Sequence, residues 1–137
     1  MPLITVTGTT NSETLNAADR GNPAVDTFHI SADLGHDTVY GGAGDDTVFG
    51  GGGDGILYGG AFGVTTPGSG GADLVYGGDG NDTIVIYSDA GIYEGGAGND
   101  TFEILVRAAD EREIAGDAGI DRVSVTGSSV GYVQISA

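Results

Sequence analysis

Residues 77–103 read GGDGNDTIV-IYSDAGIYE-GGAGNDTFE, which is three consecutive segments of nine residues. The first and third share glycine at positions one, two and four, aspartate at position six and a large apolar residue at position eight. Glycine adopts positive φ at no steric cost, so the first six residues of such a segment predict a turn. The last three, as in Thr83-Ile84-Val85, are β-branched or aromatic and predict a short strand. The stretch therefore predicts a repeating unit of one turn and one strand.

The same unit recurs along most of the chain. Gly-Gly pairs begin at positions 41, 50, 59, 77 and 95, separated by nine residues or by twice nine. The further copies, from nearly complete to weak, are GGAGDDTVF from Gly41, GDAGIDRVS from Gly116, ADLGHDTVY from Ala32, GGGGDGILY from Gly50, GTTNSETLN from Gly8 and GNPAVDTFH from Gly21. A strand of three residues cannot bury its apolar face alone, so successive units must stack on one another.

The consensus Gly-Gly-x-Gly-x-Asp-x-U-x, where U is a large apolar residue, resembles the nonapeptide of the RTX (repeats-in-toxin, hemolysin-type) calcium-binding family over residues 8–124. The resemblance implies an all-β fold: a right-handed parallel β-roll, or β-solenoid, with two nonapeptides per turn and several calcium ions between stacked loops. We expect a single domain over residues 1–137. It comprises a degenerate N-terminal cap at 1–31, core repeats at 32–103, and C-terminal half-turns with a cap at 104–137.

The charge of the chain excludes several classes of partner. Its 137 residues include 20 acidic and four basic ones, which gives a net charge of −16. Four cationic side chains cannot neutralise a nucleic acid backbone, and the same charge disfavours an anionic membrane surface. The chain has no cysteine, which excludes disulfides and thiolate metal sites, and no lysine, which excludes a P-loop. We therefore expect cations, not nucleic acid or a membrane, as partners.

The core is predicted by the middle residue of each short strand, which is the only one that is reliably apolar. Side chains alternate between the two faces of a strand, so this residue points inward and its neighbours point outward. The expected inward residues are Val39, Val48, Leu57, Val75, Ile84, Phe102 and Val123.

The expected metal sites follow from the spacing of the loops. Calcium takes six to eight oxygen ligands from carboxylates and backbone carbonyls. Loops on one edge of the roll recur every eighteen residues, as Asp82 and Asp100 do, whereas the segment between them has Gly91 at the aspartate position and predicts no strong site. The expected ligands are the carboxylates of Asp37, Asp46, Asp73, Asp82, Asp100 and Asp121, and oxygen atoms of the loop residues Gly41, Ala43, Gly77, Asp79, Gly95, Ala97 and Gly116.

The segment 59–76 can be divided in two ways. Two nonapeptides would place Asp46 and Asp73 on opposite edges, whereas one nonapeptide with an insertion at 62–70 would make them stacked neighbours. We favour the insertion, because Pro67 would otherwise stand in a strand, where it donates no hydrogen bond. Downstream, residues 104–115 are expected to form one longer half-turn that places Asp121 next to Asp100.

Several of these residues also have a purely structural interpretation. Isolated aspartates often belong to ordinary solvated turns, although nine-residue periodicity favours calcium. His29 and His36 lie in different repeats, and Ser124, Ser128 and Ser129 have no histidine nearby in the pattern, so we predict no enzyme. The residues at the outward ninth position either pack across strands or form an exposed stripe for contact with another surface: Tyr40, Phe49, Tyr58 and Tyr76.

Two functions remain open. The resemblance implies a secreted, extracellular or cell-surface protein exported by a type I system, and the N-terminus lacks the pattern of a signal peptide. The chain is then a calcium-folded structural or self-assembling surface component, or a calcium-dependent folding and secretion module of a larger enzyme, toxin or adhesin. Self-association is expected end to end, since residues 3–6 and 130–135 read as strands able to cap or extend the roll, or through the outward aromatic residues.

Overall fold

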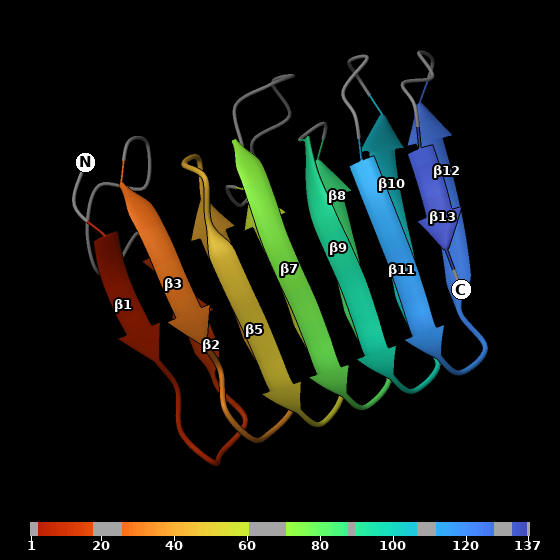
Figure 1. Cartoon of the computed structure of the whole chain (residues 1–137). Coiled ribbons are helices and arrows are strands. Elements are labelled where there is room, and N and C mark those ends of the chain that lie inside the picture. The colour runs from red at the N-terminus through yellow and green to blue at the C-terminus, as the bar shows by residue number, and fades with distance from the viewer. Residues whose placement is uncertain are drawn as a thin grey trace.

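A computed structural model describes residues 3–17, 26–60, 71–87, 90–106, 112–127 and 133–136. These residues form thirteen strands and, in the ranges given, no helix long and apolar enough to cross a membrane (Figure 1). The strands are β1 (Leu3–Thr7), β2 (Thr14–Asn16), β3 (Thr27–Ser31), β4 (Thr38–Gly42), β5 (Thr47–Gly52), β6 (Ile56–Gly60), β7 (Ala72–Asp79), β8 (Thr83–Tyr87), β9 (Ala90–Ala97), β10 (Thr101–Val106), β11 (Arg112–Ala118), β12 (Arg122–Gly127) and β13 (Val133–Ser136).

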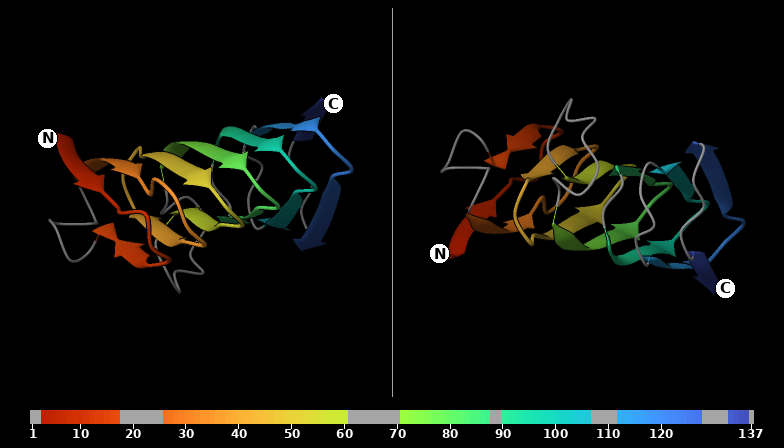
Figure 2. Two further views of the ribbon diagram at one scale, coloured as in Figure 1. Left: turned by 90° about the horizontal axis from the view of Figure 1, so that it is seen from below. Right: turned by 90° about the horizontal axis from the view of Figure 1, so that it is seen from above.

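The strands form two parallel sheets that face each other. Sheet A has the order β1-β3-β5-β7-β9-β11-β13, and sheet B has the order β12-β10-β8-β6-β4-β2. Odd strands lie in one sheet and even strands in the other, so the chain winds through both sheets in every turn (Figure 2). Two repeats per turn follow, and the predicted all-β parallel β-roll is confirmed.

The strand register shows how the repeats are phased. Tyr40 pairs with Tyr58 and Ile84 with Phe102, which are steps of eighteen residues. By contrast, every pairing across the segment 61–70 spans twenty-seven residues, as in Val48 with Val75. This register is the one that an insertion requires. Residues 62–70 themselves lie outside the described part of the chain, so the insertion stays a prediction.

The core lies between the two sheets. Six of the seven expected inward residues are completely buried: Val39, Val48, Leu57, Val75, Ile84 and Phe102. Val123 packs against this core but is only partly buried, because β12 is the last strand of sheet B. The period of two within each strand thus predicted the core well.

The weak copy that begins at Gly21 is out of phase with the roll. Aligned as a nonapeptide, this copy has Asp26 at its sixth position, so Asp26 would stack on the sixth-position aspartates of the following turns. The register instead pairs His29 with Thr47, and the N–H of Phe28 donates to Oδ1 of Asp46 at 2.8 Å. Phe28 is completely buried, and its burial together with that of Ile30 sets the phase of this strand.

The outward aromatic residues form two ladders, one on each sheet. On sheet B, the ring of Tyr58 stacks between those of Tyr40 and Tyr87, with centroid distances of 4.7 and 6.1 Å and interplanar angles of 22° and 10°. On sheet A, Phe49 stacks on Tyr76 at 5.0 Å. Because the ring faces cover each other, these residues pack across strands. Contact of their partly exposed rings with another surface stays a prediction.

Candidate metal sites

The loops between the sheets form two edges that run along the roll. The first edge, at the bottom of Figure 1, contains the loops that follow the strands of sheet A. The second edge contains the loops that follow the strands of sheet B. In successive layers, the sixth position of the repeat holds Glu13, Asp37, Gly55, Asp82, Asp100 and Asp121 on the first edge, and Phe28, Asp46, Asp73, Gly91 and Arg112 on the second.

One oxygen of each of these aspartates is held by the neighbouring layer. Each turn of the roll adds one layer, and Oδ1 of an aspartate accepts a hydrogen bond from the backbone N–H of the sixth-position residue in the preceding layer. For example, the N–H of Asp82 donates to Oδ1 of Asp100 at 2.8 Å. On the first edge the same bond joins Glu13 to Asp37, Gly55 to Asp82 and Asp100 to Asp121. On the second edge it joins Phe28 to Asp46 and Asp46 to Asp73, and all these distances are 2.7–3.0 Å. These bonds fix the orientation of each carboxylate without any metal.

The second oxygen is left for another ligand. Among the described residues, Oδ2 of Asp37, Asp46, Asp82 and Asp100 is buried and accepts no hydrogen bond. The four side chains are 1% exposed. Burying an unsatisfied carboxylate oxygen is strongly unfavourable, so this arrangement is stable only with a cation or a proton at these atoms.

The protonation of these carboxylates reflects their burial. Burial raises the pKa of Asp46 to about 7, although the N–H of Phe28 lowers it. The pKa of Asp82 is raised to about 6, again mainly by burial, with a smaller contribution from Asp100. The pKa of Asp100 is raised for the same reason. Burial therefore shifts each of these metal-free carboxyl groups toward the neutral acid, whereas a bound cation would favour the carboxylate.

The first glycine of each repeat leaves open the space in front of Oδ2. A Cβ on Gly77 would lie 2.5 Å from Oδ2 of Asp82 and would also overlap the carbonyl oxygen of Gly95, one layer further on. A Cβ on Gly41 would likewise meet Oδ2 of Asp46 and the carbonyl oxygen of Gly59. Carboxylate and carbonyl oxygens thus border one cradle on each edge. These donors fit calcium, which prefers oxygen ligands at about 2.3–2.6 Å.

The structure brings most of the predicted carboxylates together in pairs. Asp82, Asp100 and Asp121 occupy three successive layers of the first edge. Asp46 and Asp73 occupy successive layers of the second edge. Metal ligation by these residues stays a prediction, since the pairing alone does not test it.

Asp37 has a different setting. Its neighbours in the column are Glu13 and Gly55, so no second aspartate is paired with it. The first position of its own repeat is Ala32, which is completely buried and carries a methyl group where the other repeats have an open space. The structure thus supports Asp37 as a metal ligand less strongly than it supports the paired aspartates.

Several loop carbonyls proposed as ligands already take part in the backbone ladder. The carbonyl oxygen of Asp79 accepts the N–H of Gly53 at 2.7 Å, and that of Ala97 accepts the N–H of Gly80 at 2.8 Å. Each retains one lone pair for a metal. No three His, Asp or Glu side chains converge on one point within the described ranges, so carbonyl oxygens must supply part of any coordination shell.

A second ladder on the outside of the first edge was not predicted from the sequence. It uses the fifth position of the repeat and runs in the opposite direction to the aspartate ladder. The N–H of Asn99 donates to Oδ1 of Asn81 at 2.9 Å, the N–H of Asn81 to Oδ1 of Asp54 at 2.7 Å, and the N–H of Asp54 to Nδ1 of His36 at 3.0 Å. The feature of the sequence that could have predicted this ladder is the recurrence of Asn or Asp directly before the sixth-position aspartate.

Comparison with known protein families identifies the repeat. The chain matches the RTX calcium-binding nonapeptide repeat in four copies, over residues 29–62, 68–91 and 87–103. No curated protein and no solved structure gives a match to the chain. The matched ranges contain the paired aspartates of both edges up to Asp100.

Proposed function

The chain belongs to the RTX calcium-binding nonapeptide repeat family, and we propose that it is a secreted, non-catalytic structural module that folds when calcium binds outside the cell. The observation that carries the proposal is the set of buried, unsatisfied Oδ2 atoms of Asp46, Asp82 and Asp100. Two of these atoms border a cradle that a glycine keeps open toward a carbonyl oxygen.

Calcium supplies the charge that the fold itself lacks. The chain carries −16, and burial disfavours the charged form of the loop carboxylates. The core consists of only one or two fully inward residues in most strands, and no cysteine is present to form a disulfide. We propose that without the ion this burial does not offset the conformational entropy of a glycine-rich chain.

A non-catalytic role is supported by the settings of the two histidines. His29 lies against the ring of Phe49 with a centroid distance of 5.2 Å. Nδ1 of His36 accepts the N–H of Asp54, so this atom is already used in the outer ladder. These contacts account for both imidazoles without catalysis, and the proposed metal ligation accounts for the loop carboxylates.

A calcium titration followed by far-UV circular dichroism tests the proposal. We expect a disordered spectrum in calcium-free buffer and a β-rich spectrum with a midpoint of about 10⁻⁴–10⁻³ M, as in other extracellular calcium modules. Magnesium is the control: it requires a smaller, octahedral site and should not induce the transition at the same concentrations. The same β spectrum in excess chelator would refute calcium-driven folding.

A further inference from the structure

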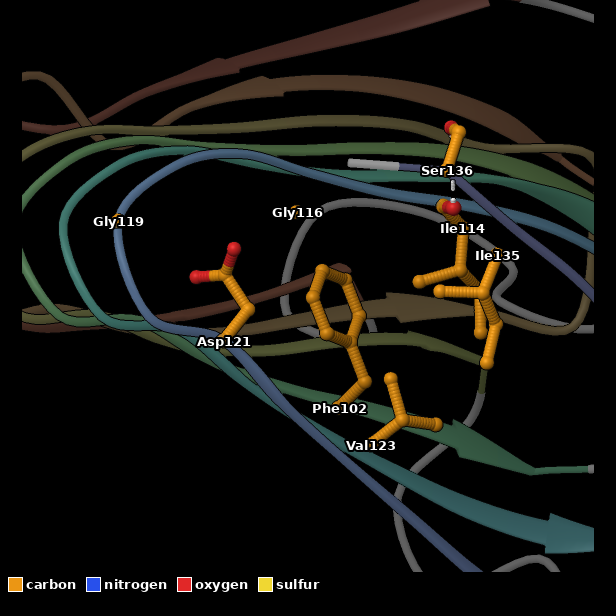
Figure 3. Close-up of a pocket in the computed structure, with 8 residues that line it drawn as sticks. All are labelled: Phe102, Ile114, Gly116, Gly119, Asp121, Val123, Ile135 and Ser136. Atoms are coloured by element: carbon orange, nitrogen blue, oxygen red, sulfur yellow. Dashed lines mark hydrogen bonds between the residues drawn. The ribbon is translucent and has the colours of Figure 1, made fainter.

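Two features of the roll lie beside the aspartate columns, a cavity and a row of phenol rings. The cavity, of about 330 Å³, lies near β12 and β13, and Phe102, Ile114, Val123 and Ile135 form its apolar wall (Figure 3). Its carboxylate, Asp121, belongs to the aspartate column of the first edge. The phenol rings on the outer face of sheet B, by contrast, are reactive groups that the metal sites do not use.

The backbone holds two of these rings directly against each other. Tyr40 and Tyr58 are partners in the pairing of β4 with β6. Their ring centroids lie 4.7 Å apart at an interplanar angle of 22°. Tyr87 lies 6.1 Å from Tyr58 and two residues beyond Val85, the residue that pairs with Tyr58. Tyr40 and Tyr58 are therefore the closer and better aligned pair.

The rings of this ladder combine contact between phenols with access from solvent. Tyr40, Tyr58 and Tyr87 are half-buried on the outside of sheet B. The ladder of sheet A differs, because Tyr76 stacks there on Phe49, which has no hydroxyl group. A small reagent can thus reach two phenols that already touch on sheet B, whereas on sheet A it meets one phenol beside a phenyl ring.

The hydroxyl groups of the ladder lie near one another. The pKa of Tyr58 is raised, first by partial burial and then by Tyr40, Tyr87 and Glu103. Charge interactions of this kind are appreciable only at short range near a protein surface, so these groups face a common space. Tyr58 is therefore a neutral phenol in neutral solution, and it must release a proton when it is oxidised.

The strand spacing suits a covalent bond between the two rings. Neighbouring strands lie about 4.8 Å apart, and paired side chains project from the same face of the sheet. Rotation of each ring about its Cβ–Cγ bond turns the ring edges toward each other across this spacing. Side chains that are partly exposed make such rotations within nanoseconds. The sheet thus presents two phenols in register for carbon–carbon coupling.

A bond at this position would join one turn of the roll to the next. The chain has no cysteine, so no disulfide can connect the turns. Tyr40 and Tyr58 stand eighteen residues apart, which is one complete turn, and the segment between them contains Asp46. Closing such a loop restricts the unfolded chain and stabilises the folded one.

We propose that Tyr40 and Tyr58 form an oxidative cross-linking site, at which hydrogen peroxide and a haem peroxidase join the two rings as dityrosine. Each phenol loses one electron and its hydroxyl proton. The two radicals couple through the ring carbons ortho to oxygen, and each of these carbons then passes its hydrogen to the oxygen of the same ring. The peroxide takes up the two electrons and two protons and becomes two molecules of water.

The test treats the calcium-loaded protein with a haem peroxidase and hydrogen peroxide at low protein concentration. We expect dityrosine fluorescence in chains that remain single on a denaturing gel and are lighter by two hydrogen atoms. Cleavage before aspartate residues places Tyr40, Tyr58 and Tyr87 in separate peptides, so mass spectrometry identifies the linked pair. Chains joined only to one another, or a link between other tyrosines, would overturn the site.

Substitutions by phenylalanine keep the rings and remove the reacting hydroxyl. Tyr58→Phe should abolish the link, and Tyr40→Phe serves the same purpose if the first variant fails to fold. Tyr76→Phe is the matched control, because the partner of Tyr76 in the stack is already Phe49, so the yield should be unchanged. An unchanged yield of linked peptide from Tyr58→Phe would contradict the assignment.

This inference rests on the proposed function, since the calcium-loaded roll is what stacks the rings. In excess chelator we expect at least about fivefold less link, because the rings are no longer held together. The linked chain should also fold at a lower calcium concentration than the unlinked chain. A chain that folds with calcium but forms no link, or one that links equally well when disordered in chelator, would overturn the cross-linking site alone. The same circular dichroism spectrum with calcium and with chelator would contradict the proposed function instead.

Discussion

The two edges of the roll have the same backbone arrangement but differ in where the column of carboxylates is interrupted. The first edge has three aspartates in successive layers, Asp82, Asp100 and Asp121. On the second edge, Asp46 and Asp73 are followed by Gly91 and then by the buried Arg112. We therefore expect calcium to bind where aspartates occupy successive layers without interruption, rather than wherever an aspartate occurs in a loop. The edges should therefore contribute to calcium binding in different halves of the molecule.

The largest effect is expected at the middle of the longer run. Asp100→Asn removes a charge that lies between Asp82 and Asp121, so it weakens two adjacent sites. A charged hydrogen-bond or ligand interaction contributes about 1.5–3 kcal/mol, which predicts a rise in the calcium midpoint of about tenfold to a hundredfold. Circular dichroism at increasing calcium concentration gives the midpoint.

Asp82→Asn and Asp73→Asn should have smaller effects, since each shares one site with another aspartate. Asp79→Asn is the matched control, because it removes the same charge from an exposed side chain in the same loop as Asp82. If Asp79→Asn raised the midpoint as much as Asp82→Asn, the assignment of the ligands would be wrong.

The column of aspartates on the first edge is interrupted at Gly55, and a substitution there can fill the gap. A Cβ on Gly55 would lie 3.0 Å from Oδ1 of Asp82 and 3.5 Å from Leu57, so a side chain fits there with a small adjustment. Gly55→Asp would join Asp37 to the longer run, and we expect at least one more bound calcium per chain by isothermal titration calorimetry. Gly91→Asp is the contrasting variant on the second edge: its Cβ would overlap the carbonyl oxygen of Asp73, so it should add no ion and should destabilise the roll. An unchanged stoichiometry in a folded Gly55→Asp variant would contradict the importance of uninterrupted runs.

The calcium midpoint should depend on pH through one buried carboxylate on each edge, Asp46 and Asp82. Unfolded aspartate has a pKa of about 3.9, whereas burial raises that of Asp46 to about 7 and that of Asp82 to about 6. Between these values the folded, metal-free chain binds more protons than the unfolded chain, so its stability falls as the pH rises from about 4 to about 7. Calcium must displace these protons. We therefore expect a higher calcium midpoint and more residual β structure without calcium at pH 5 than at pH 8, measured by circular dichroism. Equal midpoints at the two pH values would show that these carboxylates are not ligands.

Deletion of residues 62–70 should have the smallest effect. It joins Ala61 to Gly71 and restores the copy GGAGADLVY, while Asp46 and Asp73 stay in successive layers. We expect a calcium midpoint within about twofold of the original. Deletion of residues 86–94 is a control of equal length that removes strand residues of β8 and β9 and moves Asp100 to the other edge. Loss of calcium-dependent folding in the first variant would show that 59–67 is a genuine half-turn.

The repeat predicted the parts of the molecule that depend on period and spacing. The inward position of Val48 and Ile84 follows from alternation within a strand, and the stacking of Asp82 on Asp100 follows from two nine-residue units per turn. Parts that depend on variable positions were not predictable. His36 enters the outer ladder only because the backbone presents the N–H of Asp54 to it. Arg112 reaches the aspartate column of the second edge through a half-turn whose length the repeat does not define.

A crystal structure grown with calcium, with anomalous scattering data, tests most directly whether calcium binds between the paired aspartates. We expect an anomalous peak between the loops that contain Asp82 and Asp100, at about 2.3–2.6 Å from Oδ2 of Asp82 and from a loop carbonyl oxygen. We expect a second peak between the loops of Asp46 and Asp73, and none beside Gly91 and Arg112. A folded roll whose buried carboxylates carry no peak, or whose calcium ions lie only on exposed aspartates such as Asp79, would contradict calcium binding by the paired aspartates.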